Sequence, residues 1–439
     1  MKRLLQFILT ALAKAYVWRY KPAIIAVTGN VGKTSTKEAI KAVLGKIKKI
    51  RSGAGNLNNE LGVPLTILGN WSEQYYESGG TPWFWFKVLA LGAGRLIFDG
   101  SCPEILLLEF GADRPKDIKR LTAKFKPHIG VVTTVGEVPV HVEYFSGPEA
   151  VAKEKAKLLE PLLSSDFAVL NHDDAAVLDM KNKTKARVTT FGFTDGATVR
   201  ISNFDFRTDE AGRPAGTTFK LNYGESFVPV KLEDALGKSQ AWAAAAAAAV
   251  GLIFGMNLVT ISDALQLYRA PKGRLKLLKG IKNSLLIDDT YNASPASMHI
   301  ALETLKMLPL NTGRRIAVLG DMLELGRYSL DAHREIGNLV GSFADKLVCV
   351  GAKARFMADS AANQMSGENI FVFDASGQAK NKVKEILTEG DLVLIKGSQG
   401  IRMEKIVEEI MAEPERKGEL LVRQNKKWLE IMPPSSSPV

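Results

Sequence analysis

Cysteine is almost absent from this sequence of 439 residues. The two cysteines, Cys102 and Cys349, lie far apart and form no CxxC pair, which argues against a zinc ribbon or a disulfide framework. A reducing cytoplasm is therefore the expected location. The sequence also lacks a recognisable RNA- or DNA-reading module, and its lysines are not interleaved with stacking aromatics. We accordingly expect no nucleic-acid partner.

The composition is otherwise that of a folded protein with more than one domain. Hydrophobic residues make up 46% of the chain and charged residues 24%, which argues against wholesale disorder and against a polytopic membrane protein. The length predicts two or three units, each with its own core. The formal net charge of +11 fits either a solvated basic surface or attraction to phosphates and anionic lipid headgroups.

Two apolar segments carry basic residues. Residues 1–22 predict an amphipathic helix that is too short to span a bilayer and has no small-residue cleavage site. A second stretch, residues 82–98, contains Trp83, Trp85 and Lys87, which are typical interface anchors. Both segments fit packing on the protein's own body or contact with a membrane surface. A peripheral position at the inner membrane face is therefore the alternative to a purely cytoplasmic location.

Short apolar runs alternate with helical stretches along most of the chain, as in a buried parallel sheet. Residues 186–232 instead mix apolar and turn residues and predict a small antiparallel element. A second α/β series begins near residue 271, and the final prolines and serines predict a disordered end. The predicted parallel strands are 24–27, 105–108, 129–132, 285–287, 315–319, 346–350, 370–373 and 392–395.

The most specific local motif is a glycine loop between a buried strand and a helix. Gly29 and Gly32 let backbone amides face phosphate oxygens, and Lys33 reaches the β- and γ-phosphates. A strict Walker pattern has glycine where Val27 stands, so the loop is a variant. The predicted ligand is an ATP-type nucleotide with Mg²⁺. The expected nucleotide-binding residues are Thr28, Gly29, Asn30, Val31, Gly32, Lys33, Thr34 and Ser35.

Other polar residues follow predicted strands, where open α/β sheets bind ligands. Glu109 ends one strand and could hold Mg²⁺ beside the glycine loop. By spacing alone, His141 fits a structural histidine as well as a ligand. Asp289 ends a strand of the second series and fits either a nucleotide contact or a helix cap. Arg274, just upstream, could reach phosphate.

Together these motifs resemble the Mur ligase family, and most closely its branch that adds D-alanyl-D-alanine to UDP-muramoyl-tripeptide. The matching stretches occur in the family's order and extend from residue 23 to about residue 412. They are residues 28–36, 56–64, 109–115, 141–143, 288–295, 318–326 and 396–404.

The resemblance implies an α/β fold in which a P-loop parallel-sheet ATPase domain precedes a Rossmann-like C-terminal domain. The implied divisions are an N-terminal helix (1–22), a central domain (23–270) with an aromatic insertion (about 71–103), a C-terminal domain (271–412) and a tail (413–439). The resemblance implies that Lys33 and Thr34 contact phosphate and magnesium, and that Glu109, His141 and a carbamylated Lys155 are magnesium ligands. It implies that Arg274 contacts the γ-phosphate and that Asp289 and Asn292 contact the nucleotide. Asn58 and Asn59 would contact the acceptor.

The implied reaction is ATP-dependent formation of an amide through an acyl phosphate. The expected partners are a small-molecule or lipid-linked cell-wall precursor and an amino acid or dipeptide. The first alternative is a ligase acting on another carboxylate, as folylpolyglutamate synthases do. The second is a membrane-associated nucleotide-binding scaffold without ligase activity.

The sequence departs from the family pattern in several places, among them Ala244, where an asparagine is common, and Lys157, in place of a frequent glutamate. The glycine loop starts at residue 28, so the family's N-terminal UDP-binding domain is expected to be absent and the acceptor to be recognised in another way. Gly237 to Gln240 stand where the family usually has His-Asn after a basic residue. Because those family residues help to hold the adenine, the selectivity for adenine is left open.

Overall fold

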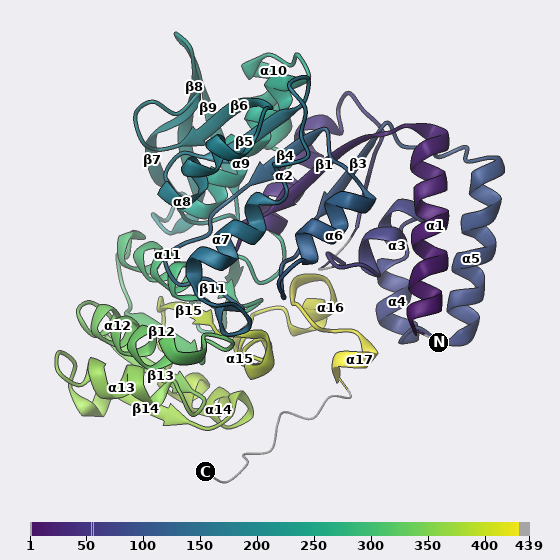
Figure 1. The fold of residues 1–439 in the computed structure, drawn as a ribbon. Helices are drawn as coiled ribbons and strands as arrows, with labels where there is room; N and C mark the ends of the chain where they lie inside the picture. Colours follow the sequence, from purple (N-terminus) through teal and green to yellow (C-terminus); the bar gives the residue numbers. More distant parts are fainter. Residues whose placement is uncertain (1, 54, 56, 430–439) are drawn as a thin grey trace.

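The computed structural model describes residues 2–53, 55 and 57–429. Within these residues the chain forms a nine-stranded sheet and a six-stranded sheet, each with helices on both faces (Figure 1). The N-terminal helix lies at one side of the molecule, beside the first sheet (Figure 1). The predicted fold class, a parallel α/β ATPase unit followed by a second α/β unit, is confirmed.

The first sheet has the strand order β2-β3-β1-β4-β5-β6-β7-β8-β9. Neighbours from β2 to β7 are parallel, and β7 to β9 form the antiparallel element expected from residues 186–232. Its central strands are apolar on both faces because helices cover both. The strands are β1 (Ala23–Thr28), β2 (Ile50–Ser52), β3 (Ile105–Glu109), β4 (Ile129–Val132), β5 (Phe167–Asn171), β6 (Arg187–Gly192), β7 (Val199–Thr208), β8 (Pro214–Tyr223) and β9 (Ser226–Glu233).

The two faces of the first sheet are covered differently. One face packs on α2 and the alanine-rich α9, whose small side chains allow close helix contact. The other packs on α6 and α7 and on a layer of α1, α3, α4 and α5. The helices are α1 (Lys2–Tyr20), α2 (Lys33–Leu44), α3 (Gly62–Leu68), α4 (Ser72–Ser78), α5 (Pro82–Ile97), α6 (Asp117–Lys124), α7 (Pro148–Ala156), α8 (Ala175–Leu178), α9 (Lys238–Ile253) and α10 (Leu258–Leu265).

The second sheet has the order β10-β11-β15-β12-β13-β14, with β10 antiparallel to β11 and the other neighbours parallel. Two separate apolar clusters fill its two faces. Its strands are β10 (Lys276–Lys279), β11 (Leu285–Asp289), β12 (Arg315–Gly320), β13 (Lys346–Val350), β14 (Ile370–Phe373) and β15 (Leu392–Lys396). Its helices are α11 (Pro295–Met307), α12 (Ser329–Gly341), α13 (Arg355–Ala361), α14 (Ser376–Ile386) and α15 (Glu404–Ile410).

Beyond α15 the chain continues as two short helices, α16 (Lys417–Leu420) and α17 (Lys426–Leu429). Leu421 is buried in the second unit, so this part of the tail is folded. The predicted disordered end, from residue 433, lies outside the described residues. In the described part of the chain, no helix combines the length and apolar character that crossing a bilayer needs.

Candidate active site

The carboxyl ends of strands from both sheets meet around one cavity of about 450 Å³. The glycine loop follows β1 and Glu109 ends β3, while the second unit contributes residues that follow β11, β12 and β15. Predicted site residues from both sequence regions line this cavity: Asn30, Val31, Lys33, Asn58, Glu109, His141, Lys155, Arg274 and Asn292. Thr28, Ser35 and Asp289 are buried but are not part of that lining.

The glycine loop has a backbone that requires glycine at two positions. Gly29 has φ 143°, and a Cβ there would lie 1.9 Å from Thr133 Oγ1. Gly32 has φ 87° and directly precedes α2. A side chain is strained in this left-handed region, and the closeness of Thr133 leaves no room for one at Gly29. The loop therefore presents its backbone at the N-terminus of α2, where helix geometry favours anions.

Lys33 and Thr34, at the start of α2, face different partners. Lys33 Nζ donates to Gly29 O at 2.8 Å, and burial lowers the pKa of this amine, with Glu109 acting in the opposite direction. Thr34 Oγ1 donates to Glu109 Oε2 at 3.1 Å, and Asn58 Nδ2 donates to Glu109 Oε1 at 3.4 Å. A buried carboxylate, a hydroxyl and an amide are thus gathered beside the loop.

Lys155 lies on α7 with only 2% of its surface exposed. Its Nζ donates to Gly29 O at 3.0 Å, so it shares with Lys33 one carbonyl of the glycine loop. Burial, together with the positive charge of Lys33, lowers the pKa of Lys155 to about 7. A substantial fraction of this amine is therefore neutral near physiological pH, the nucleophilic form of a lysine.

His141 connects the two units of the chain. Its Nε2 lies 3.3 Å from Asp113 Oδ1, and its Nδ1 lies 2.5 Å from Glu324 Oε2. Glu324 follows β12 of the second unit, and the interaction with His141 lowers the pKa of its carboxyl. Sequence reasoning assigned no role to Asp113 or Glu324 individually, although both lie within stretches that resemble the family. Their importance depends on a contact between regions far apart in the chain.

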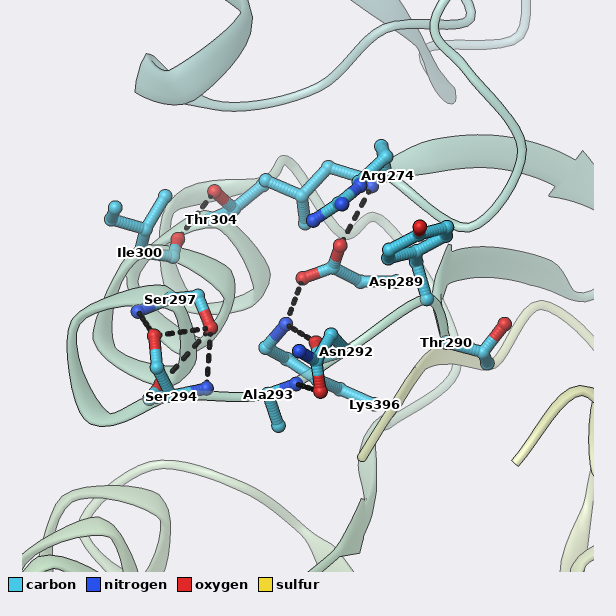
Figure 2. Close-up of polar contacts among 12 residues, drawn as sticks. Arg274, Asp289, Thr290, Asn292, Ala293, Ser294, Ser297, Ile300, Thr304 and Lys396 are labelled. Carbon is cyan, nitrogen blue, oxygen red and sulfur yellow. Dashed lines mark hydrogen bonds and ion pairs between the residues drawn. The ribbon is translucent and has the colours of Figure 1, made fainter. Parts of the chain in front are cut away.

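Figure 2 shows the polar contacts at the end of β11. Lys396 Nζ lies 2.6 Å from Asp289 Oδ2 and donates to Asn292 O at 2.8 Å. Asp289 Oδ1 also accepts from the Leu275 amide at 3.2 Å. In this structure the Asp289 carboxylate is thus paired with protein groups, while Asn292 lines the cavity. Burial raises the pKa of the neighbouring Asp288 to about 6.

Arg274 extends over the ring of Tyr291, with its Cζ 3.9 Å from the ring centroid. Within the described residues, its Nε is buried and has no hydrogen-bond partner. Gln240 Nε2 donates to the backbone carbonyl of Arg274 at 2.6 Å, and Tyr268 Oη donates to Gln240 Oε1 at 2.5 Å. The residue that departs from the family pattern, Gln240, therefore fixes the backbone that carries this guanidinium.

A second cavity, of about 840 Å³, adjoins the first and shares with it Arg274, Tyr291, Gln399 and Trp428. Thr34 and Asn59 line it as well. The Asn59 side chain accepts from the amides of Leu61 and Gly62 at the start of α3, so it also has a structural role. Sequence reasoning gave Tyr291 no role, although it lies within the matching stretch 288–295. It missed Trp428, which belongs to no recognisable chemical motif. Further lining comes from α4 and the C-terminal segment: Glu73, Tyr75, Tyr76, Glu77, Val422, Arg423 and Gln424.

The oxygen groups beside the glycine loop suit Mg²⁺. This ion is commonly held by one or two carboxylates together with phosphates and water, and Glu109 with the Thr34 hydroxyl provides such a hard-oxygen pair. The described residues contain no cluster of three or more His, Cys, Asp or Glu side chains able to hold a metal by themselves. The donor set therefore fits a magnesium ion that takes some of its ligands from the protein and the rest from a bound nucleotide, rather than an ion held by the protein alone.

Two family models match this chain. The Mur ligase middle domain matches residues 98–251, and the Mur ligase glutamate ligase domain matches residues 273–399. A Mycobacterium tuberculosis (H37Rv) protein named UDP-N-acetylmuramoyl-tripeptide--D-alanyl-D-alanine ligase is 30% identical over 411 residues, which are 89% of this chain and 73% of that protein. The chain belongs to the Mur ligase family.

Solved structures agree with this assignment. The MurF ligase from Thermotoga maritima in complex with ADP is similar with a TM-score of 0.75 and 25% identity, over 94% of this chain and 84% of that one. The Mycobacterium tuberculosis folylpolyglutamate synthase complexed with ADP has a TM-score of 0.64 at 16% identity, over 92% and 96% of the two chains. The second likeness concerns the fold alone.

Proposed function

We propose that this Mur ligase is an ATP-dependent ligase that joins a carboxylate to an amine through an acyl phosphate. The observation that carries the proposal is the convergence of Lys33, Lys155 and Arg274 on one cavity beside Glu109. The basic side chains of Lys33 and Arg274 and a helix N-terminus favour a polyphosphate, while Glu109 and Thr34 suit its magnesium ion. Because Arg274 comes from the second unit, ATP bound there would contact both units.

In the first step, an oxygen of the acceptor carboxylate attacks the γ-phosphorus and the bond to the β-phosphate oxygen breaks. The products are an acyl phosphate and ADP. Lys33, from the glycine loop, and Arg274, from the second unit, would offset the negative charge on the transferring group. Glu109 and Thr34 would hold Mg²⁺, which would supply further charge neutralisation at the phosphate oxygens.

In the second step, the amine attacks the acyl carbon, a tetrahedral intermediate forms, and its collapse expels inorganic phosphate and leaves an amide. The amine loses a proton in this step. Closure of the second unit onto the first would hold the amine in position and exclude water, which otherwise hydrolyses the acyl phosphate. The contact of His141 with Glu324, one residue from each unit, supports such closure. We place the unit boundaries at 23–270 and 271–412.

We propose that Lys155 is carbamylated in the active enzyme. The neutral amine adds to carbon dioxide and loses one proton as the carbamate forms, and the lowered pKa of about 7 favours that neutral amine. The product would be a carboxylate-like group beside the glycine loop, in place of an ammonium that repels Lys33. His141 would contribute its Nε2, which lies 3.3 Å from Asp113 Oδ1, to a second magnesium position, while Glu324 beside its Nδ1 would fix the ring.

For substrates, we propose a peptidoglycan precursor that carries a free carboxylate and a D-alanyl-D-alanine-like amine. The support is the named activity of the relative that is 30% identical. Asn58 and Asn59, at the first and second cavities, would face the acceptor. The acceptor is either UDP-linked or lipid-linked. A location in the cytoplasm or at its membrane face is consistent with both forms.

The test is phosphate release from ATP with a panel of acceptors and amines. It includes UDP-muramoyl-tripeptide with D-Ala-D-Ala, the lipid-linked equivalent, and a folate with glutamate. Product with a muramoyl acceptor supports the proposal, whereas product with folate alone favours the folylpolyglutamate synthase alternative. ATP binding without turnover on any acceptor would instead indicate the nucleotide-binding scaffold.

A further inference from the structure

Helices α1 and α5 each expose an apolar stripe on the side opposite their buried stripe. On α1 the exposed residues recur at helical spacing, as do the buried Leu9, Ala13 and Tyr16. On α5 the buried face is Phe84, Val88 and Gly92. The exposed apolar residues of the two helices, here called the α1–α5 face, include Leu4, Phe7, Ile8, Ala11, Trp18, Trp83, Phe86, Ala90, Leu91 and Ile97.

The two stripes belong to one surface because the helices share a support. Both helices pack on α3 and contribute to the same apolar cluster. Arg19 Nε donates to Leu96 O at 3.1 Å and Tyr20 Oη to Arg95 O at 2.8 Å, which ties the two C-terminal ends together. Figure 1 shows the two helices side by side at the edge of the molecule. Their outer sides therefore point away from the protein body.

The charged residues of the two helices are of one sign. Neither helix contains an aspartate or a glutamate. On α1, Arg3 and Lys14 flank the apolar stripe on one side and Arg19 on the other, as the helical spacing dictates, and Lys87 lies within the exposed side of α5. Trp18 and Trp83 are 77% and 72% exposed. Apolar residues with exposed tryptophans and a basic border are typical of helices that lie in the plane of an anionic bilayer.

The second cavity lies directly behind this layer. Tyr75 of α4 contacts the rings of Phe84 and Trp85 on α5, with centroids 5.9 and 5.7 Å apart. Tyr75 also lines the second cavity, which shares lining residues with the cavity of the glycine loop. A surface on which α1 and α5 rest would therefore be close to the route by which an acceptor reaches the reacting phosphate.

We propose that the α1–α5 face binds the surface of an anionic lipid bilayer and thereby holds the second cavity next to an acceptor carried in that bilayer. The second part rests on the proposed ligase function, whereas the first does not. A second copy of this chain is a poorer occupant, because a two-fold contact through this face would bring the Arg3, Lys14 and Arg19 groups of both copies together. Insertion would be shallow, since neither helix is long and apolar enough to cross a bilayer.

The first test is co-sedimentation of the full chain with vesicles of phosphatidylcholine alone or mixed equally with phosphatidylglycerol. We expect binding to the anionic vesicles. The apolar variant Phe7→Ser/Trp18→Ser/Trp83→Ser/Phe86→Ser should bind at least about tenfold more weakly. The charge variant Arg3→Glu/Lys14→Glu should lose about tenfold on anionic vesicles and little on neutral ones.

Matched controls place the same changes elsewhere on the exposed surface. Phe227→Ser/Leu267→Ser and Lys181→Glu/Lys183→Glu should bind vesicles as the wild type does, and denaturant unfolding should show that all variants fold. Wild-type protein that stays in the supernatant, or an apolar variant that sediments fully, would overturn the proposal. A wild-type dimer that the apolar variant converts to monomer, without vesicle binding, would identify the face as a protein interface and also overturn it.

The second test separates this inference from the ligase function. With a lipid-linked acceptor in anionic vesicles, the apolar variant should show a KM raised at least about tenfold, while its kcat and its KM for a water-soluble acceptor stay at wild-type values. If the apolar variant and the wild type have equal KM values for the lipid-linked acceptor on vesicles, the face does not deliver the acceptor, even if the protein binds lipid. Vesicle binding without turnover on any acceptor would instead refute the ligase function and leave the bilayer contact standing.

Discussion

Two buried lysines of the site differ in what faces their amines. Lys396 Nζ lies 2.6 Å from the Asp289 carboxylate and donates to the Asn292 carbonyl. Lys155 is equally buried, but its Nζ donates to the Gly29 carbonyl, and no carboxylate lies within ion-pair distance of it in the described part of the chain. Burial lowers the pKa of both amines, and Asp289 opposes this effect at Lys396.

The difference separates a structural charge from a reactive one. The ion pair of Lys396 with Asp289 joins the ends of β15 and β11, and each buried charge has its partner inside the second unit. Lys155 is held beside another cation, Lys33, without an ion-pair partner, which is costly for an ammonium and favours the neutral amine. We therefore expect function to depend on Lys155 and stability to depend on Lys396.

The largest expected effect is on catalysis. Lys155→Ala should lower kcat by about 10³-fold, as removal of a positioned charge from a transition state does, without lowering the free energy of unfolding. Lys33→Ala should behave similarly. Steady-state phosphate release and urea unfolding measure the two quantities. The control is Lys157→Ala, a nearby lysine that pairs with Glu160 at the surface. Near wild-type turnover in Lys155→Ala would remove the distinction between the two lysines.

The reverse result is expected for the paired lysine. Lys396→Met leaves Asp289 buried without its partner and should cost about 3–5 kcal/mol of unfolding free energy. Asp289→Asn in the Lys396→Met background should recover part of that loss, because the uncompensated charge is removed. Urea unfolding of the two single variants and the double variant measures the coupling. Independent, additive losses would show that the pair is not the structural link described here.

Arg274 tests whether the second unit contributes to phosphate chemistry. Arg274→Ala should lower kcat by about 10²-fold, and Arg274→Lys should not restore it, since an ammonium cannot reproduce a planar guanidinium stacked on Tyr291. Arg334→Ala, an exposed arginine on α12, is the control. Initial rates at saturating ATP measure the effect. Full activity in Arg274→Lys would mean that only the charge matters.

A further prediction concerns the pH dependence of stability. The pKa of Lys155 is about 7 in the folded chain, against about 10.4 in an unfolded one. Between these values the unfolded chain binds more protons, so this group makes unfolding free energy rise with pH. Its penalty is largest below pH 7 and fades toward pH 10. Lys155→Met should have a higher free energy of unfolding than the unmodified wild type at pH 7, and this difference should shrink toward pH 10 in urea titrations. A difference that stays constant with pH would contradict the lowered pKa.

Local sequence patterns predicted much of the fold and part of the site. The apolar runs around residues 24–27 and 392–395 form strands as expected, because burial on both faces leaves a continuous signal. Three strands were not predicted, among them β2, which has three residues, and β10, whose Leu277 and Leu278 lie between lysines. Short or charged segments carry little periodic signal.

The contacts that give the side chains of the site their separate roles could not be predicted from local sequence patterns. Asp289 and Lys396 lie on strands that are adjacent in the sheet but distant in sequence. Gln240 departs from the family pattern, and its role becomes visible only through its bond to the Arg274 carbonyl. Trp428 lines both cavities because the segment after α15 folds back over the site. Each depends on tertiary packing rather than on a local motif.

The most direct test of the proposed chemistry follows oxygen. A muramoyl-tripeptide acceptor labelled with ¹⁸O in its terminal carboxylate is incubated with ATP, Mg²⁺ and D-Ala-D-Ala, and the released phosphate is analysed by mass spectrometry. An acyl phosphate requires one carboxylate oxygen to leave with the phosphate, so we predict one ¹⁸O atom in each phosphate formed by the wild type and no labelled phosphate from Lys33→Ala. Amide product accompanied by unlabelled phosphate would contradict the mechanism.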